Sequence, residues 1–335
     1  MTKLLFVISA AFVALVSGLP TLWSPFTAPA KFKNPGTLVA LPPQDFQALG
    51  SQKVQIQFGP FAVGNEAANG QNVQDLQDAT RPCTGPCYIY RHRAFLNYVN
   101  GSEANINGGS VLKRSFISTT ARQDSVCAEN NELAFLSANE RLPYDLGVNG
   151  TSKVGYLLPD ATMNVYAEVV NYNPDAQEYF LVLEFEFVPG TAAGFQHLTP
   201  YYLDSSGPCG PSMLTAPPNA TSFDTIMPGT FSLPKSGYIY AVGGHVEDGG
   251  TSLELLSNGA TLCQAQASYG GSASYVDWTG TPRVSSMTTC FDVGNQTAGD
   301  QWSVTGHYDL TQHPVLPLGS NPAPVVAAFE AFVLH

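Results

Sequence analysis

The sequence predicts an all-β protein built from two antiparallel β-sandwich domains of jelly-roll type in tandem. Short segments of alternating apolar and polar residues recur along the chain, turns rich in glycine, proline and asparagine separate them, and no long run has helical periodicity. The 335 residues exceed what one hydrophobic core usually serves, so two domains are expected. We predict a signal peptide over residues 1–18, a first sandwich over 19–190 and a second over 191–335.

The first 20 residues have the layout of a cleaved secretory signal. Lys3 precedes an apolar run of about a dozen residues, and the small residues Ser17 and Gly18 follow it. This run is shorter than the roughly 20 apolar residues that a membrane span requires, and no later segment qualifies. We therefore expect an exported protein, extracellular or in the cell wall, with no membrane partner.

The first half of the chain contains several predicted strands. Residues 22–52 are rich in proline and small residues and are expected to form an irregular lead-in or an edge segment. Residues 67–80 are polar, which predicts a loop or a short helix. The predicted strands are 54–59, 87–99, 108–120, 156–159, 163–173 and 179–189.

The last of these strands has the clearest pattern. Four apolar residues at alternate positions from Leu181 to Phe187 share one face, while Glu184 and Glu186 lie on the other. Such a strand belongs to a sheet that buries one face.

The second half of the chain repeats this organisation after the glycine-containing segment 189–194, where we expect the change of domain. Asn258 and Gly259 are a tight-turn signal between two strands. The predicted strands are 230–233, 238–242, 252–256, 260–265, 301–309 and 325–334.

The six cysteines all lie after the predicted signal peptide, and an even count in an exported chain predicts disulfides. Six cysteines allow fifteen pairings. We favour Cys263 with Cys290, which would join two strands of the second half, and Cys83 with Cys87, which would close a small loop. Four Asn-x-Ser/Thr sequons predict surface glycosylation at Asn100, Asn149, Asn219 and Asn295.

The net charge of −12 argues against nucleic acid and anionic membranes as partners, because both require a basic surface. No Gly-x-Ser-x-Gly nucleophile motif, phosphate-binding glycine loop or dinucleotide fingerprint is present. Pairs such as Glu184 with Glu186 could be proposed for glycoside hydrolysis, but any acidic protein supplies such pairs. Exposed aromatic residues could bind cell-wall polysaccharide.

The strongest candidate for chemistry is His245 with Glu247, between two glycine pairs. In an extended chain, residues two apart point to the same face, so the imidazole and the carboxylate would lie together. They could ligate a metal or simply form hydrogen bonds at a turn. His307 and His313 could join them only if their strands are neighbours, and His92 is expected to be a satisfied histidine on a sheet face.

The block that begins at Gly244 as Gly-His-Val-Glu-Asp-Gly-Gly, with the later Asn-Gly-Ala-Thr-Leu-Cys and Tyr-Gly, resembles a block of fungal secreted proteins related to the stress-up-regulated nodulin family. That family is similar in turn to the peptidylglycine α-hydroxylating monooxygenase type of fold. The resemblance implies two tandem β-sandwiches, each with a copper site. It also aligns the segment Arg91-His-Arg with a strand that carries a His-His pair.

Residue by residue, the resemblance implies weakened copper sites. Glu247 stands where the family has the second histidine of His-x-His, Arg93 replaces the second histidine of the pair after His92, and the methionine expected near the last strand is missing. The sequence therefore predicts a secreted glycoprotein with degenerate metal sites and no catalysis. It leaves open a metal-dependent, copper oxidoreductase at His245 and Glu247, or a cell-wall carbohydrate- or partner-binding protein. No cofactor is expected, although copper or another divalent ion is possible.

Overall fold

The computed structural model describes residues 35–65, 71–141, 143–209, 213–316 and 324–335. The predicted signal peptide lies outside these residues. In the described part of the chain, no helix is both long enough and apolar enough to cross a membrane. The only helical segments there are three short 3-10 turns, so the chain is all-β as predicted.

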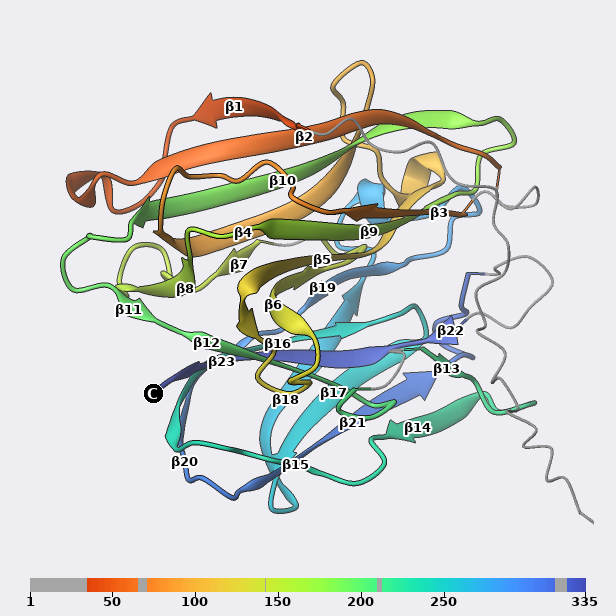
Figure 1. Cartoon of the computed structure of the whole chain (residues 1–335). Helices are drawn as coiled ribbons and strands as arrows, with labels where there is room; N and C mark the ends of the chain where they lie inside the picture. Colours follow the sequence, from red (N-terminus) through yellow and green to blue (C-terminus); the bar gives the residue numbers. More distant parts are fainter. Residues whose placement is uncertain (1–34, 66–70, 142, 210–212, 317–323) are drawn as a thin grey trace, which may run out of the picture.

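The strands form two sandwiches stacked as four layers (Figure 1). In the first sandwich, one sheet has the order β1-β2-β10-β4-β8-β11, with β7 also paired to β4, and the other has the order β3-β9-β5-β6. The strands are β1 Thr37–Leu41, β2 Gln52–Val63, β3 Gln71–Leu76, β4 Cys87–Tyr98, β5 Ser110–Gln123, β6 Asn131–Ser137, β7 Tyr144–Asp145, β8 Val154–Leu158, β9 Met163–Asn171, β10 Gln177–Pro189 and β11 Gln196–His197.

In the second sandwich, one sheet has the order β12-β23-β16-β20, and the other has the order β14-β21-β17-β18-β19 with β15 beside β21. The pair β13-β22 stands apart. The strands are β12 Thr199–Asp204, β13 Leu214–Thr215, β14 Ser222–Ile226, β15 Phe231–Ser232, β16 Gly237–Val246, β17 Gly250–Ser257, β18 Ala260–Tyr269, β19 Val284–Met287, β20 Cys290–Gln296, β21 Gln301–Asp309, β22 Pro324–Val325 and β23 Ala327–Leu334.

The predicted domain limit at 190/191 falls between β10 and β11. All described strand pairs are antiparallel except that β11 runs parallel to β8, so a short strand after the predicted limit joins a sheet of the first sandwich. The limit itself stays a prediction.

The alternation of apolar and charged residues in β10 places the apolar side chains in the core, as predicted. Leu181, Leu183 and Phe185 are fully buried in the core of the first sandwich. On the opposite face, Glu184 and Glu186 form ion pairs with Lys53 at 2.9 and 3.3 Å. These two carboxylates are therefore structural, which removes the support for a hydrolytic pair at this place.

The prediction for residues 67–80 is wrong, because 71–76 form strand β3 along the edge of β9. Gln74 and Leu76 point inward and are buried. The strand forms because β9 offers an unpaired edge, which the polar local sequence does not reveal. The strands at 131–137, 199–204, 222–226 and 290–296 were also not predicted, since their alternation is weak or their apolar content low.

The tight turn at Asn258 and Gly259 is present between β17 and β18, and both residues have positive φ angles of 51° and 82°. This left-handed backbone is the conformation for which asparagine and glycine are favoured in a two-residue hairpin turn. All four sequon asparagines are exposed, so each could carry a glycan.

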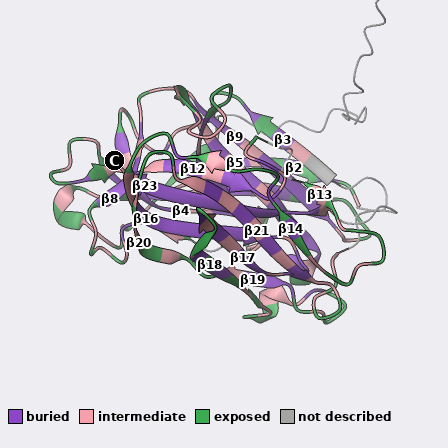
Figure 2. Cartoon of the chain, turned by 90° about the horizontal axis from the view of Figure 1, so that it is seen from below, coloured by how far each residue is buried: buried purple, intermediate pink, exposed green. Residues whose placement is uncertain are grey.

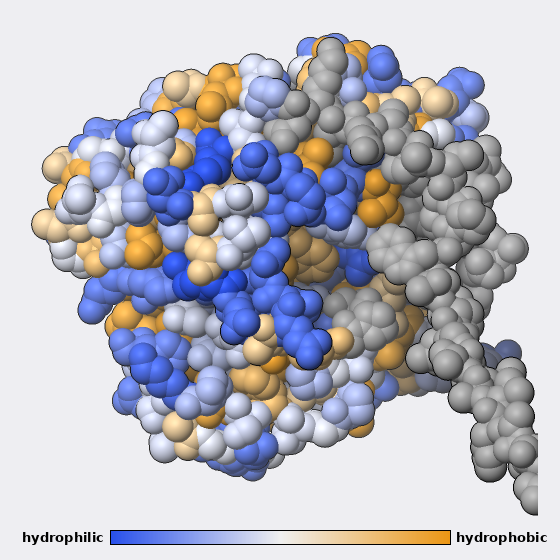
Figure 3. All heavy atoms as spheres, in the orientation of Figure 1, coloured by the Kyte–Doolittle hydropathy of each residue, from blue (hydrophilic) through white to orange (hydrophobic). Residues whose placement is uncertain are grey.

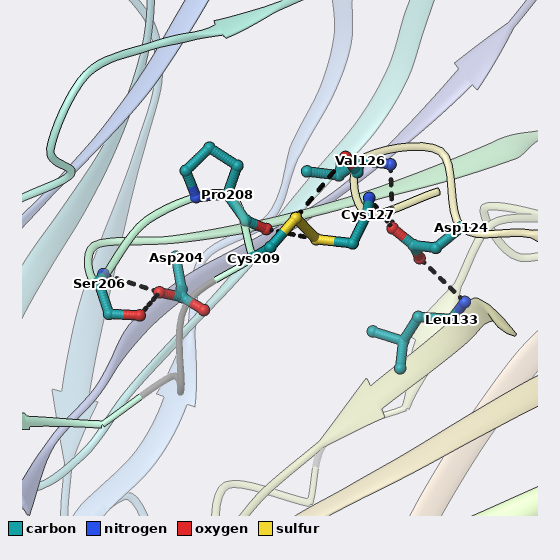
Figure 4. Close-up of a disulfide and its surroundings, with 8 residues drawn as sticks. All are labelled: Asp124, Val126, Cys127, Leu133, Asp204, Ser206, Pro208 and Cys209. Carbon is teal, nitrogen blue, oxygen red and sulfur yellow. Dashed lines mark hydrogen bonds between the residues drawn. A yellow bond between two sulfur atoms is a disulfide. The ribbon is translucent and has the colours of Figure 1, made fainter. Parts of the chain in front are cut away.

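Three disulfides leave no free cysteine among the described residues. The two favoured pairs, Cys83–Cys87 and Cys263–Cys290, are both present. The third, Cys127–Cys209, joins the loop between β5 and β6 of the first sandwich to the segment after β12 of the second (Figure 4). The two sandwiches are therefore tied covalently at one edge.

The sandwiches also share a buried interface, and the overlapping strands at the centre of Figure 2 are mostly buried. Alternate residues of β23 face the first sandwich: Phe332 belongs to the core of the first sandwich, and its ring lies 6.0 Å from that of Phe135. Ala241 of β16 joins the same core. The two sandwiches thus pack against each other through the sheet that contains β16, the strand on which His245 lies.

Candidate functional site

His245 is the next-to-last residue of β16, and Glu247 follows the end of that strand. Both side chains line one small cavity between the two sandwiches. His245 is 4% exposed, whereas Glu247 is half-buried. The spacing of two residues therefore does place the imidazole and the carboxyl group on the same cavity, as an extended strand requires.

The partner of His245 comes from the other sandwich. Nδ1 of His245 lies 3.1 Å from Oε2 of Glu140, in the segment that follows β6. Burial disfavours the charged imidazole, but attraction and hydrogen bonding to Glu140 outweigh it and raise the pKa of His245 above 6.5. The pair is a buried imidazole–carboxylate contact that bridges the two halves of the molecule.

Glu247 lies beside a second charged cluster on the first sandwich. Lys113 Nζ is 3.3 Å from Glu168 Oε1, and Arg114 Nε donates to Glu168 Oε2 at 2.7 Å. Burial raises the pKa of Glu247, and attraction to Lys113 and His245 opposes that rise. Negative and positive groups thus alternate across the interface, with protein cations near each carboxylate.

The cavity itself has a volume of about 40 Å³. A single water requires roughly 10–15 Å³ measured in this way, so the cavity can hold a few waters or an ion but not an organic substrate. Its walls are largely apolar, with Val111, Val170 and Val284 among them. Any reaction on a larger molecule at His245 would require the two sandwiches to separate locally.

The position aligned with the His-His pair offers no metal site. His92 is 1% exposed, with Phe135 and Phe185 rings each 4.9 Å from its own, and burial lowers its pKa to about 3. Arg93 next to it is bound by both carboxylate oxygens of Glu103 at 2.9 Å. One residue is a neutral ring in the core and the other is a paired cation.

The two remaining candidates lie elsewhere. His307 Nδ1 contacts Asp224 Oδ1 at 2.8 Å on the outer sheet of the second sandwich. His313 stacks on Tyr269 with ring centroids 3.5 Å apart. The hydroxyl of Tyr269 donates to Gly250 O at 2.8 Å, so His313 packs behind the turn that follows Glu247 rather than entering the cavity.

These positions do not fit a copper centre. Copper oxygenation needs several imidazoles that converge on open coordination positions. Within the described ranges, no group of three or more His, Cys, Asp or Glu side chains is placed to hold a metal ion. The expected candidates His92, His245, His307 and His313 are each engaged in a different environment, so we derive no reaction step through a metal.

Sequence reasoning missed Glu140 and Lys113. Glu140 lies 105 residues before His245, and no local motif marks either residue. They meet His245 and Glu247 only because the β5-β6 sheet of the first sandwich packs against the sheet that contains β16. A search for charged residues of opposite sign could have found them, but the sequence alone does not show which residues lie opposite His245 and Glu247.

We expect the stabilising contribution of His245 to disappear as pH rises. Its folded-state pKa is raised above 6.5, so the charged imidazole stabilises the fold fully below about pH 6.5, and this is lost as pH passes the folded-state pKa. Urea unfolding of the wild type and His245→Gln from about pH 5 to pH 9 should give a difference that shrinks with pH.

Glu140→Gln provides the control for this titration. It removes the negative charge that raises the pKa of His245, so burial then dominates and the pKa should fall below 6.5. Imidazole proton chemical shifts measure both values directly. A pKa that stays unchanged in Glu140→Gln would contradict the ion-pair assignment.

Comparison with known proteins places the chain among fungal proteins. No protein-family model matches the sequence. "Probable copper-dependent oxygenase M1" of Phoma sp. is 28% identical over 284 residues, which cover 84% of this chain and 72% of that protein. "Probable copper-dependent oxygenase clz3" of Cochliobolus lunatus is 30% identical over 245 residues, which cover 72% of this chain and 77% of that protein.

Solved structures add little. PNGase F, a glycosylasparaginase from Flavobacterium meningosepticum, superposes on 84% of this chain and 96% of its own with a TM-score of 0.38 and 9% identity. This structural similarity is too low to indicate a relationship. The two fungal sequences are informative, because each alignment covers more than two thirds of both proteins. This chain therefore belongs to the same family as these fungal proteins, which are named probable copper-dependent oxygenases.

Proposed function

We propose that this chain is a secreted, glycosylated member of the family that holds no copper at His245 and catalyses no oxidation there. The observation that supports the proposal is the set of residues around His245. Lys113 and the carboxyl groups of Glu140, Glu247 and Asp248 line the cavity with it, and among the described residues no second histidine does. The more distant links to the nodulin family and to a peptidylglycine monooxygenase-like fold remain part of this proposal.

Charge supports this proposal. A copper ion would bring positive charge into the cavity, where the carboxylates could balance it. Here His245, whose pKa is raised by Glu140, faces that carboxylate, and Lys113 and Arg114 supply positive charge beside Glu247. A metal ion at this place would be repelled by these fixed cations and would have to displace the proton on His245.

The test is copper content and its dependence on His245. The purified chain, loaded with Cu(II) and dialysed, should retain well below one copper per chain, and His245→Ala should retain the same amount. His307→Ala is the matched control, since that histidine also contacts a carboxylate but lies on the outer sheet. One copper per chain that is lost in His245→Ala and kept in His307→Ala would overturn the proposal.

A variant designed to gain copper binding distinguishes a copper site that was lost by substitution from a scaffold that never bound copper. Glu247→His restores the His-x-His pattern, and Lys113→Met removes the cation beside it. If the cations and the missing imidazole are the reason for weak binding, the double variant should retain more copper than the wild type. Equal copper in both would contradict that reason.

The second candidate function is a metal-dependent oxidoreductase at His245 and Glu247. One observation favours it besides the names of the relatives: a carboxylate on one imidazole nitrogen often orients a histidine whose other nitrogen binds a metal. Glu140 stands in that relation to His245. In that case, the copper-loaded chain should consume oxygen in the presence of a reductant, and His245→Ala should not.

A further inference from the structure

A larger groove lies at another part of the seam between the sandwiches, next to the Cys127–Cys209 disulfide (Figure 4). It has a volume of about 340 Å³, within the range of small-molecule sites and much larger than the cavity at His245. Its lining comes from β5, β6, β9 and the β5-β6 loop on one side and from β12 and its following segment on the other.

Three half-buried aromatic rings form the wall of this groove. Phe116 of β5 lies 5.9 Å from Tyr166 of β9 and 5.8 Å from Tyr202 of β12, measured between ring centroids. The Phe116 and Tyr202 rings are perpendicular, at 90°, so they present a corner rather than a single flat surface. A ligand in the corner would contact rings from both sandwiches.

Polar side chains from the β5-β6 loop and from the start of β6 line the same groove. Asn130 and Asn131 are exposed, and their side-chain amides bond to no other described residue. Asp124 is held by the backbone N–H groups of Val126 and Cys127 at 2.9 and 2.8 Å. The loop therefore has a fixed shape and offers both donors and acceptors beside the rings.

The disulfide keeps the two walls together. Cys127 follows Asp124 in the loop of the first sandwich, and Cys209 follows β12 of the second, and both residues line the groove. A site whose walls are already fixed loses less entropy when a ligand binds. The groove is thus organised before binding, without closure of a lid.

We propose that this groove binds a neutral oligosaccharide of hexose or N-acetylhexosamine units. Sugar rings have apolar C–H faces that pack on aromatic rings and hydroxyl groups that exchange hydrogen bonds with amides and carboxylates, and the groove supplies both. None of its described lining residues is basic, and the chain has a net charge of −12, so anionic polysaccharides are disfavoured. The face in Figure 3 is mostly hydrophilic, with apolar residues in small groups.

The proposal is tested by calorimetric titration of the full glycosylated chain with cellotetraose, laminaritetraose and chitotetraose. Saturable binding of at least one is expected, and the one that binds identifies the source as a glucan or chitin. Tyr202→Ala should weaken it about tenfold, equivalent to about 1.4 kcal/mol. No saturable binding of any of the three would overturn the proposal.

Two further variants keep the result interpretable. Asn131→Trp places a bulky ring at the rim without removing any of the three aromatic rings, and it should abolish binding while the thermal transition is unchanged. Trp278→Ala removes an aromatic residue that is 49% exposed but outside the groove, and should bind like the wild type. Equal binding by the wild type and Asn131→Trp would show that the sugar binds elsewhere and would contradict the assignment. Because the groove excludes His245, copper content has no bearing on this outcome.

Discussion

Replacing Cys127 and Cys209 by serine is expected to lower the free energy of unfolding by about 4–5 kcal/mol. The bond closes a loop with a sequence separation of 82, and in the chain-entropy model the loss grows with the length of that loop. It is also the covalent link between the two sandwiches among the three disulfides described. Chemical unfolding under non-reducing conditions measures the change.

Cys83→Ser with Cys87→Ser is the matched control. Those cysteines are only four residues apart, so the same model gives a loss of about 2 kcal/mol. Equal losses for both pairs would show that loop closure is not the dominant contribution. A transition that splits into two steps only when the Cys127–Cys209 bond is absent would show that the bond couples the unfolding of the sandwiches.

Arg141→Met is expected to be the most destabilising substitution near the candidate site. The guanidinium is almost fully buried and donates to the carbonyls of Ala104 and Ser110 and to the Asn105 side chain. Methionine fills similar space but leaves these acceptors without donors, and each unpaired buried group costs about 1–3 kcal/mol. We expect a loss of about 3 kcal/mol or more, measured by urea unfolding.

A second effect of the same substitution connects stability to the site. Arg141 directly follows Glu140, whose carboxylate holds His245, so loosening this segment should lower the pKa of His245 toward 6.5. Lys235→Met is the control, because it removes a positive charge from an exposed position on the second sandwich. A large loss in Lys235→Met, or an unchanged pKa of His245 in Arg141→Met, would contradict this expectation.

Local sequence was sufficient for those features that depend on neighbours along the chain. The alternation in 179–189 predicted which side chains of β10 enter the core, because side chains of a strand alternate between faces. Asn258 and Gly259 predicted their turn because few other residues tolerate left-handed backbone. The same reasoning put His245 and Glu247 on one cavity.

Tertiary structure alone decided what those side chains meet. Residues 71–76 form a strand because they pair with the edge of β9. Their polar sequence does not show that the edge of a distant strand is available for pairing. Glu140 meets His245, and Lys113 lines the same cavity, through the packing of one sandwich on the other. Which side chains meet across the interface depends on the order of the strands in each sheet and on their register. The same alternation of apolar and polar residues is compatible with many orders and registers. The sequence by itself therefore determined an all-β chain that contains a His-x-Glu motif. Only the packing of the two sandwiches determined that the histidine of this motif meets a carboxylate from the other sandwich in a buried contact.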